Sequence, residues 1–209
     1  MLKYRKIDTS CPEYPECERI WSDSFPAKER PDEDKFRSNV DSNPQFTLLA
    51  ILYVSDIPVE KVPTAACPIG CNDDAGQGDV YQGDACQDNV KVVGLMTWWD
   101  FGDFIYGEHF ALSSELRGNG LGSRAFCEIT ASFDKPFVFE VEAPSSDNPI
   151  AERRIKFYGR CGMILSDLPY FQPPYRVGDA PIPMCLMTSD ASFPIGKAKE
   201  VIYRQVYGL

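Results

Sequence analysis

Apolar residues in the first half of the chain follow the spacings of strands and helices. Alternating or continuous apolar runs predict strands over 2–7, 45–54, 94–99 and 105–112. After the first of them, Pro12 opens a predicted helix whose apolar positions are Tyr14, Cys17 and Trp21. That helix should end near 25–26, and a second short helix is predicted over 32–40.

In the second half, helical and strand patterns alternate. A helix from Gly120 to just before Pro136 is predicted by four apolar residues at helical spacing, Leu121, Ala125, Ile129 and Phe133. A strand over 137–141 follows, and then a helix that Asn148 and Pro149 open and a left-handed Gly162 closes. Two strands, one after Met163 and one over 184–189, flank the proline-rich turn YFQPPY, and a final helix starts near 193. This order predicts a mixed α/β sheet in one domain over 1–209.

The stretch 55–89 interrupts this pattern. It is rich in Pro, Gly and Asp and has little apolar periodicity, although two neighbouring antiparallel strands need only a short turn. An insertion of this length is either a functional flap or partly disordered, and both remain open. Its Cys67, Cys71 and Cys86 give only a weak zinc signal, and its aspartates lack the calcium-loop template, so a solvated acidic loop without metal is favoured.

Composition bounds the class of protein. The 209 residues are 44% hydrophobic, which suffices for one core, and no apolar run approaches the roughly 18 residues of a membrane span. The N-terminus lacks the apolar region of a signal peptide, so we expect a cytoplasmic protein with no membrane partner. Reduced thiols are then favoured for the eight cysteines, with Cys127 and Cys161 inside apolar segments, and disulfides stay an open alternative for Cys67, Cys71 and Cys86.

A formal net charge of −10 argues against a nucleic-acid partner, because such binding needs basic side chains against phosphates. The charge does not exclude a small anionic ligand. Backbone amides together with a few local cations, such as Arg117, Arg124 and Lys156, can hold a diphosphate whatever the overall sign.

The most informative segment is 108–122, EHFALSSELRGNGLG, which predicts a strand running into a glycine-rich turn. Its spacing is Arg117-x-x-Gly120-x-Gly122. Glycines let successive N–H groups converge on an anion, and a helix that starts there adds the positive end of its dipole. No Lys-Ser or Lys-Thr follows the glycines, and the glycine run is one residue short of the dinucleotide fingerprint, so two commoner phosphate loops are excluded.

The turn resembles the coenzyme A loop of the GNAT superfamily of N-acetyltransferases. A second element, from Phe157-Tyr158 to Gly162-Met163, resembles the Phe-Tyr-x-x-x-Gly-Phe element of that family, with Met163 in place of the aromatic residue. The resemblance implies a mostly antiparallel sheet, flanked by helices and splayed at the coenzyme A site. It also implies transfer of an acetyl group from acetyl-CoA, as co-substrate, to a primary amine by direct attack in a ternary complex.

The same resemblance implies site residues. The coenzyme would contact Phe110, Ala111, Leu112, Arg117, Gly118, Asn119, Gly120, Leu121, Gly122 and Ser123. The backbone N–H near Leu112 would stabilise the developing oxyanion, and Tyr158 would protonate the leaving thiolate. The family's asparagine seven residues before the tyrosine is replaced here by Ala151, so no coenzyme contact is assigned there.

Glu108 is the candidate general base. Alternation in its strand puts Tyr106, Glu108 and Phe110 on one face and His109 on the other. A carboxylate in an apolar strand should have a raised pKa, as a base for an ammonium substrate requires. Pairing with an arginine would account equally for the presence of a carboxylate at this position. For His109, the only histidine, a structural role is favoured over proton transfer.

The identity of the acceptor amine stays open among a polyamine, an amino acid, an antibiotic amine and a peptide N-terminus. An acyl group longer than acetyl is a further open alternative. The segments FPxxER, YxEHFA and QPPY resemble a subgroup of bacterial GNAT proteins, which would place Phe25, Glu29, Arg30 and His109 near the acceptor. Core packing is favoured for Trp98 and Trp99. An acyl-enzyme on Cys127 or Cys161, a non-catalytic coenzyme A-binding or partner-interaction protein, and a homodimer are open alternatives.

Overall fold

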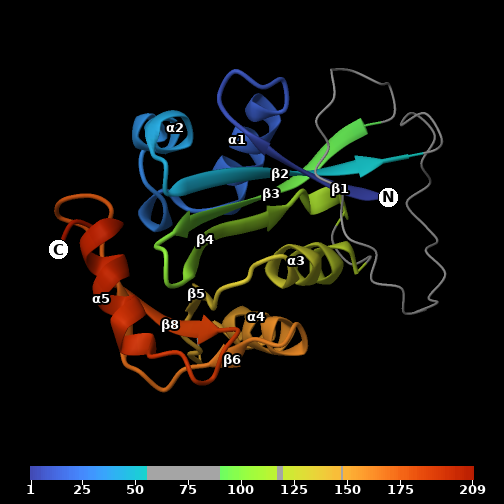
Figure 1. The fold of residues 1–209 in the computed structure, drawn as a ribbon. Coiled ribbons are helices and arrows are strands. Elements are labelled where there is room, and N and C mark those ends of the chain that lie inside the picture. Colours follow the sequence, from blue (N-terminus) through green and yellow to red (C-terminus); the bar gives the residue numbers. More distant parts are fainter. Residues whose placement is uncertain (56–89, 117–119, 147) are drawn as a thin grey trace.

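A computed structural model describes residues 1–55, 90–116, 120–146 and 148–209. Its strands form one eight-stranded sheet in the order β1-β2-β3-β4-β5-β8-β6, with β7 also paired to β8 (Figure 1). The strands are β1 Leu2–Ile7, β2 Phe46–Val54, β3 Val90–Asp100, β4 Ile105–Leu112, β5 Phe137–Glu142, β6 Ile164–Leu165, β7 Tyr170–Gln172 and β8 Ile182–Thr188. All pairs are antiparallel except β4 with β5.

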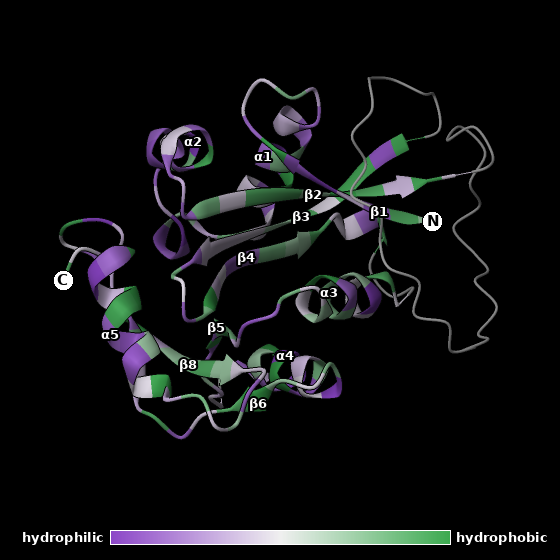
Figure 2. Ribbon diagram, viewed as in Figure 1, coloured by the Kyte–Doolittle hydropathy of each residue, from purple (hydrophilic) through white to green (hydrophobic). Residues whose placement is uncertain are grey.

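Helices cover both faces of the sheet. They are α1 Tyr14–Ser24, α2 Glu33–Ser42, α3 Leu121–Ala131, α4 Pro149–Arg160 and α5 Ile195–Gln205, with short 3-10 turns at Ala27–Glu29 and Ser114–Leu116. On one face, α1, α2 and α5 bury residues such as Trp21, Phe36 and Ile202. On the other face, α3 buries Phe126 and Ile129. Along α5, purple and green stretches alternate in Figure 2, as an amphipathic helix requires.

These elements confirm the predicted mixed, mostly antiparallel α/β class. Asp32 caps α2 by accepting the Lys35 N–H at 2.8 Å, and Gly162 follows α4 with φ 84°. The prediction of a turn over YFQPPY is partly wrong, because the first three residues of this segment form β7 against β8. The candidate flap, zinc and calcium residues at 56–89 lie outside the described residues.

The sheet opens between β4 and β5. Their parallel pairing covers only three positions, from Ile105 opposite Phe137 to Gly107 opposite Phe139. Beyond these positions β4 stays with β3, and β5 stays with β8. β4 and β5 therefore diverge beyond these three positions while each stays paired with its other neighbouring strand, as predicted for a sheet splayed at a ligand site.

A β-bulge interrupts β4 at Glu108. Thr97 of β3 lies opposite His109, but the next residue, Trp98, lies opposite Gly107, so Glu108 has no partner of its own. One extra residue reverses the alternation of side chains. The prediction that His109 points away from the Glu108 face is therefore wrong. The His109 ring packs on Phe25 of the α1 side, with ring centroids 4.6 Å apart.

Candidate active site

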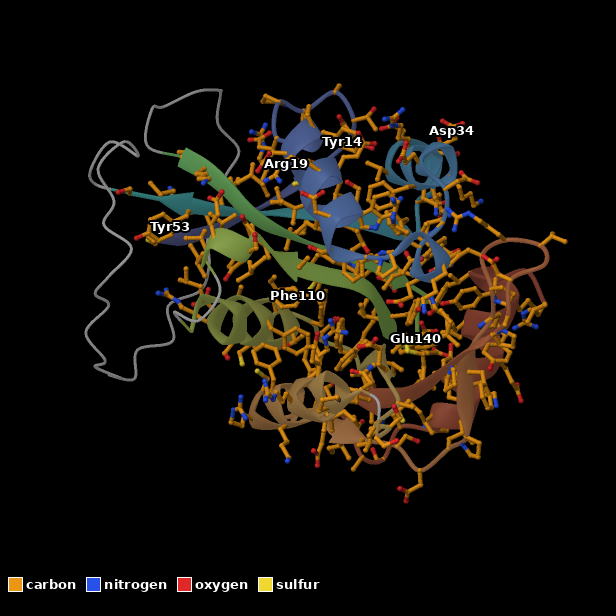
Figure 3. The ribbon with its side chains drawn as sticks, turned by 180° about the vertical axis from the view of Figure 1, so that it is seen from behind. Tyr14, Arg19, Asp34, Tyr53, Phe110 and Glu140 are labelled. Atoms are coloured by element: carbon orange, nitrogen blue, oxygen red, sulfur yellow. The ribbon has the colours of Figure 1, made fainter. Side chains whose placement is uncertain are left out.

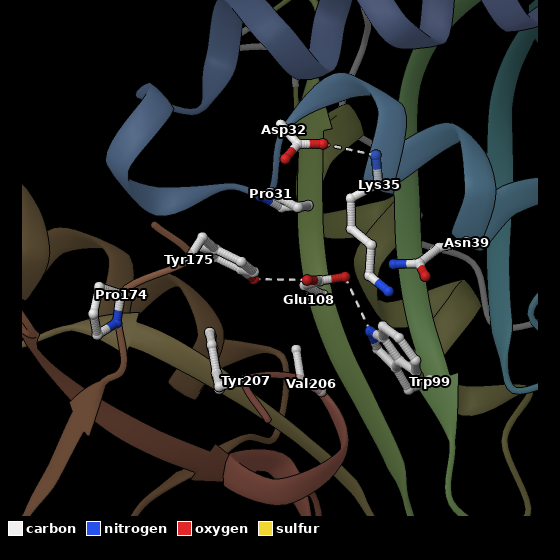
Figure 4. A pocket seen from close by; sticks show the side chains of 10 residues that line it. All are labelled: Pro31, Asp32, Lys35, Asn39, Trp99, Glu108, Pro174, Tyr175, Val206 and Tyr207. Carbon is white, nitrogen blue, oxygen red and sulfur yellow. Dashed lines mark hydrogen bonds between the residues drawn. The ribbon is translucent and has the colours of Figure 1, made fainter. Parts of the chain in front are cut away.

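Glu108 lies at the point of divergence and is almost entirely enclosed, with 3% of its side chain exposed. Two hydrogen bonds fix its carboxylate (Figure 4). Tyr175 donates its hydroxyl to Oε1 at 2.6 Å, and Trp99 donates its indole N–H to Oε2 at 3.0 Å. The carboxylate is thus held from two directions by neutral donors.

Burial raises the pKa of Glu108, while the two hydrogen bonds and the charge of Lys35 act in the opposite direction. Within the described part of the chain, no arginine lies within 4.0 Å of this carboxylate, and Nδ1 of the His109 ring lies 3.8 Å from its Oε2. Desolvation lowers the pKa of His109 to about 3, so that ring is neutral near pH 7. The geometry thus supports a base rather than an arginine-paired carboxylate.

A cavity of about 120 Å³ lies directly in front of Glu108. The sheet contributes Trp99 and Glu108, and α2 with its cap contributes Asp32, Lys35 and Asn39 (Figure 4). The remaining wall comes from the C-terminal part of the chain, chiefly Tyr175 and Tyr207. Three distant segments therefore meet around one carboxylate.

A second glutamate was missed by sequence reasoning. Glu140 is the first β5 residue beyond the pairing with β4, and it accepts hydrogen bonds from Tyr207, at 3.0 and 3.1 Å, and from Tyr170. Burial is the main cause that raises its pKa to about 7, and the charge of Glu108 adds to it. A carboxylate inside the apolar strand FVFEVE is the same signal that singled out Glu108.

His109 has the surroundings of a structural residue. Its Nδ1 lies 3.2 Å from the Thr97 hydroxyl oxygen, which also accepts the His109 backbone N–H at 3.1 Å. Aromatic rings of Trp21, Phe25 and Phe36 meet the imidazole edge-on. Its Nε2 has no hydrogen-bond partner among the described residues. The favoured structural role therefore agrees with its position.

The candidate coenzyme edge lies on the other side of β4. The Ser113 N–H donates to Val93 O of β3 at 2.9 Å, so the alternation of amides along a strand directs the Leu112 N–H to the opposite edge. That edge faces the gap left by β5. Phe110 packs on Phe126 of α3, with ring centroids 5.3 Å apart, and Figure 3 shows Phe110 between β4 and α3. Ala111 is buried against the α1 side.

The glycine turn leads directly into α3. Gly120 is the N-cap residue with φ 73°, a left-handed conformation that glycine adopts without strain. The first turn of α3 contains the predicted contacts Leu121, Gly122 and Ser123, whose N–H groups are at the positive end of the helix dipole. The predicted contacts Arg117, Gly118 and Asn119 lie outside the described residues.

Tyr158 of α4 lies across the opening from β4. Its ring packs on Phe139, the last β5 residue paired with β4, with centroids 4.6 Å apart. Burial raises the pKa of Tyr158 to about 12, and in the described part of the chain its hydroxyl has no hydrogen-bond partner. A protonated phenol free to donate is what a general acid requires.

The cysteines in the described regions are free: Cys11, Cys17, Cys127, Cys161 and Cys185. Burial, together with a hydrogen bond to Cys127, raises the pKa of Cys161 to about 12. A thiol with such a pKa is almost entirely protonated near pH 7 and is a weak nucleophile.

The predicted acceptor residues do not line the cavity in front of Glu108. The Arg30 guanidinium stacks over the Trp21 ring at 4.5 Å, and its Nε donates to Phe25 O at 3.0 Å. Glu29 is mostly enclosed, and burial followed by the charge of Glu142 raises its pKa. These residues shape the loop that leads to α2, and the cavity wall begins immediately after them.

The described residues contain no group of three or more His, Cys, Asp or Glu side chains arranged to hold a metal ion. No helix in the same residues has the length and apolar character of a membrane span.

Comparison with known proteins identifies the class. The chain is similar over 99% of both lengths to a solved structure described as "Putative acetyltransferase from GNAT family" from Bacteroides thetaiotaomicron, with 29% identity and a TM-score of 0.75. The glycine turn before α3 is one of the two segments by which the sequence resembled that family, and the sheet opens between β4 and β5 as the resemblance implied. The chain is thus similar over its whole length to an acetyltransferase described as a member of the GNAT family.

More distant relatives share the fold. NAA60 of Arabidopsis thaliana, solved with a bisubstrate analogue, is 14% identical and has a TM-score of 0.53, covering 90% of this chain and 97% of that one. Among curated proteins, "Putative acetyltransferase YjbC" of Bacillus subtilis (strain 168) is 27% identical over 84 residues. That match spans 40% of this chain and 41% of the relative. No protein-family model matches the chain.

Proposed function

We propose that the protein is an acetyl-CoA-dependent N-acetyltransferase that acts on a primary amine held in the cavity before Glu108. One observation carries the proposal. β4 borders both the cavity and the gap between β4 and β5. The bulge turns Glu108 into the cavity, while the backbone edge of the next residues faces β5 without pairing with it. An amine in the cavity and a thioester in the gap would meet at this point.

Each residue has a defined task in this proposal. Acetyl-CoA would lie along 110–112 with its diphosphate at the N-terminus of α3, and the Leu112 N–H would stabilise negative charge on the acetyl oxygen. Glu108 would accept the proton that the ammonium form of the substrate must lose before attack. Tyr158 would donate a proton to the coenzyme sulfur as the carbon–sulfur bond breaks.

Direct attack of the amine is favoured over an acyl-enzyme. Cys127 lies in α3 and Cys161 follows α4, and the raised pKa of Cys161 leaves little thiolate. Acetyl-CoA mixed with excess enzyme should therefore leave no acetyl group on the protein. Mass spectrometry that trapped an acetyl-cysteine under these single-turnover conditions would replace direct attack by the covalent route.

The proposal is tested by measuring acetyl-CoA binding by calorimetry and thiol release with a panel of primary amines. We expect binding and turnover, with kcat lowered about 100-fold in Tyr158→Phe while acetyl-CoA binding persists. Tyr203→Phe is a matched control, because Tyr203 lies on α5 and donates to Phe171 O at 2.6 Å. A protein that binds acetyl-CoA but acetylates no amine would be a non-catalytic binding module instead.

A further inference from the structure

The cavity before Glu108 contains charges of both signs, and this bears on the acceptor, given the function proposed above. The carboxylate of Glu108 comes from the sheet, and the ammonium of Lys35 comes from α2. Figure 4 shows the Lys35 side chain extending along the cavity towards the space beside Glu108 and Trp99. The two groups interact electrostatically, but no carboxylate of the described residues lies within 4.0 Å of the Lys35 nitrogen.

Asn39 lies one helical turn after Lys35 and is 5% exposed. Its side-chain amide lines the cavity, yet it makes no hydrogen bond to any described residue. The amide is not fully enclosed, so water or a molecule bound in the cavity can reach it. Asn39 and Lys35 together therefore offer unused donors on the wall that α2 forms.

Both carboxylate oxygens of Glu108, in contrast, already accept a hydrogen bond. Its carboxylate accepts from Tyr175 and Trp99, and the rings of both residues face the cavity. Aromatic faces attract an ammonium group and a carboxylate neutralises it, so this wall suits the amine. Asp32, the other acidic residue of the lining, accepts the Lys35 N–H as the cap of α2.

We propose that the acceptor is a small free amino acid, whose amine lies at Glu108 and whose carboxylate is bound by Lys35 and Asn39. The size favours a small ligand, because a cavity of about 120 Å³ corresponds to roughly four water molecules at about 30 Å³ each. A polyamine would bring a second cation against Lys35. A peptide N-terminus has no free carboxylate beside its amine to meet these donors.

The experiment compares amino acids with the amines that remain after loss of their carboxylate. Suitable pairs are serine with ethanolamine, leucine with isopentylamine, and phenylalanine with phenethylamine. The wild type should show a kcat/KM at least 10-fold higher for the amino acid of a preferred pair, since hydrogen bonds to charged groups are worth about 10- to 100-fold in binding. The members of a pair share their side chain, so the ratio isolates the carboxylate.

Two variants locate the effect. Lys35→Met should raise KM for the amino acid about 10-fold or more relative to its effect on the matching amine, and Asn39→Ala should act in the same direction more weakly. Lys91→Met is the control, because Lys91 pairs with Glu115 at the surface and does not line the cavity. Lys35 is exposed, so its substitution should preserve the fold, which a thermal melt verifies.

The outcomes separate this inference from the proposed function. If the enzyme acetylates the amines as well as the amino acids, or if Lys35→Met raises KM equally for both, the amino-acid acceptor is wrong and the acetyltransferase stands. If neither class is acetylated although acetyl-CoA binds, both conclusions fall.

Discussion

Two glutamates mark the place where the sheet opens, and they differ in what they face. Glu108 is the first residue of β4 beyond the pairing with β5, and Glu140 is the first residue of β5 beyond the pairing with β4. Burial raises the pKa of both, and tyrosine hydroxyls donate to both. Only Glu108 lines the cavity. A raised pKa is therefore not enough to identify a base, because access to the substrate decides the role.

The largest effect should separate these two carboxylates in catalysis. Glu108→Gln removes the proton acceptor but preserves the size and shape of the side chain, so we expect kcat/KM for the amine to fall about 10²- to 10⁴-fold. Glu140→Gln should change kcat/KM less than 10-fold. Steady-state kinetics of both variants, with acetyl-CoA binding as a check on folding, measures the difference. Equal losses in the two variants would place both glutamates in the catalytic machinery.

The next effect concerns stability and belongs to Glu140. Its pKa rises from 4.5 to about 7 on folding, so the native state binds more protons than the unfolded state between these values. Stability should therefore fall as pH rises from about 4.5 to 7, by at most about 3 kcal/mol at 1.36 kcal/mol per pKa unit.

Glu140→Gln should remove most of that pH dependence, because an amide does not titrate in this range. Urea unfolding at pH 5 and pH 8 measures the free energy of unfolding in both proteins. If the difference in the free energy of unfolding between the wild type and Glu140→Gln is the same at both pH values, the pKa of Glu140 does not change on folding as expected.

A smaller effect concerns the tyrosine donors. The Tyr175 hydroxyl stabilises the charged form of Glu108, so Tyr175→Phe should raise the pKa of Glu108 further. The acidic limb of the kcat/KM profile should then move to higher pH. Tyr170→Phe, which removes a donor from Glu140 instead, is the matched control and should leave that limb nearly in place. Equal shifts in both variants would mean that the acidic limb reflects the coupled titration of Glu108 and Glu140.

The sequence predicted the fold class and most of its elements, for physical reasons. Apolar periodicity located the helices and strands, and a carboxylate in an apolar strand drew attention to Glu108. The bulge could not be predicted, because one residue without a partner leaves the apolar pattern of β4 almost unchanged. That single residue reverses the face of His109.

The cavity residues proposed to bind the acceptor could not be predicted from the sequence, for another reason. Lys35 and Asn39 occupy ordinary polar positions of a short helix, and only the packing of α2 against the sheet and the C-terminal segment makes them part of a cavity. Tyr175 and Tyr207 join that cavity from positions far along the chain. Glu140, by contrast, carried the same local signal as Glu108 and could have been found.

The central claim is that Glu108 accepts the proton of the acceptor amine. Its most direct test is the pH dependence of kcat/KM for the amine in the wild type, Glu108→Gln and Glu140→Gln. The account predicts an acidic limb above the ordinary carboxylate pKa of 4.5 in the wild type, absent in Glu108→Gln and retained in Glu140→Gln. A limb that persists unchanged in Glu108→Gln would contradict it.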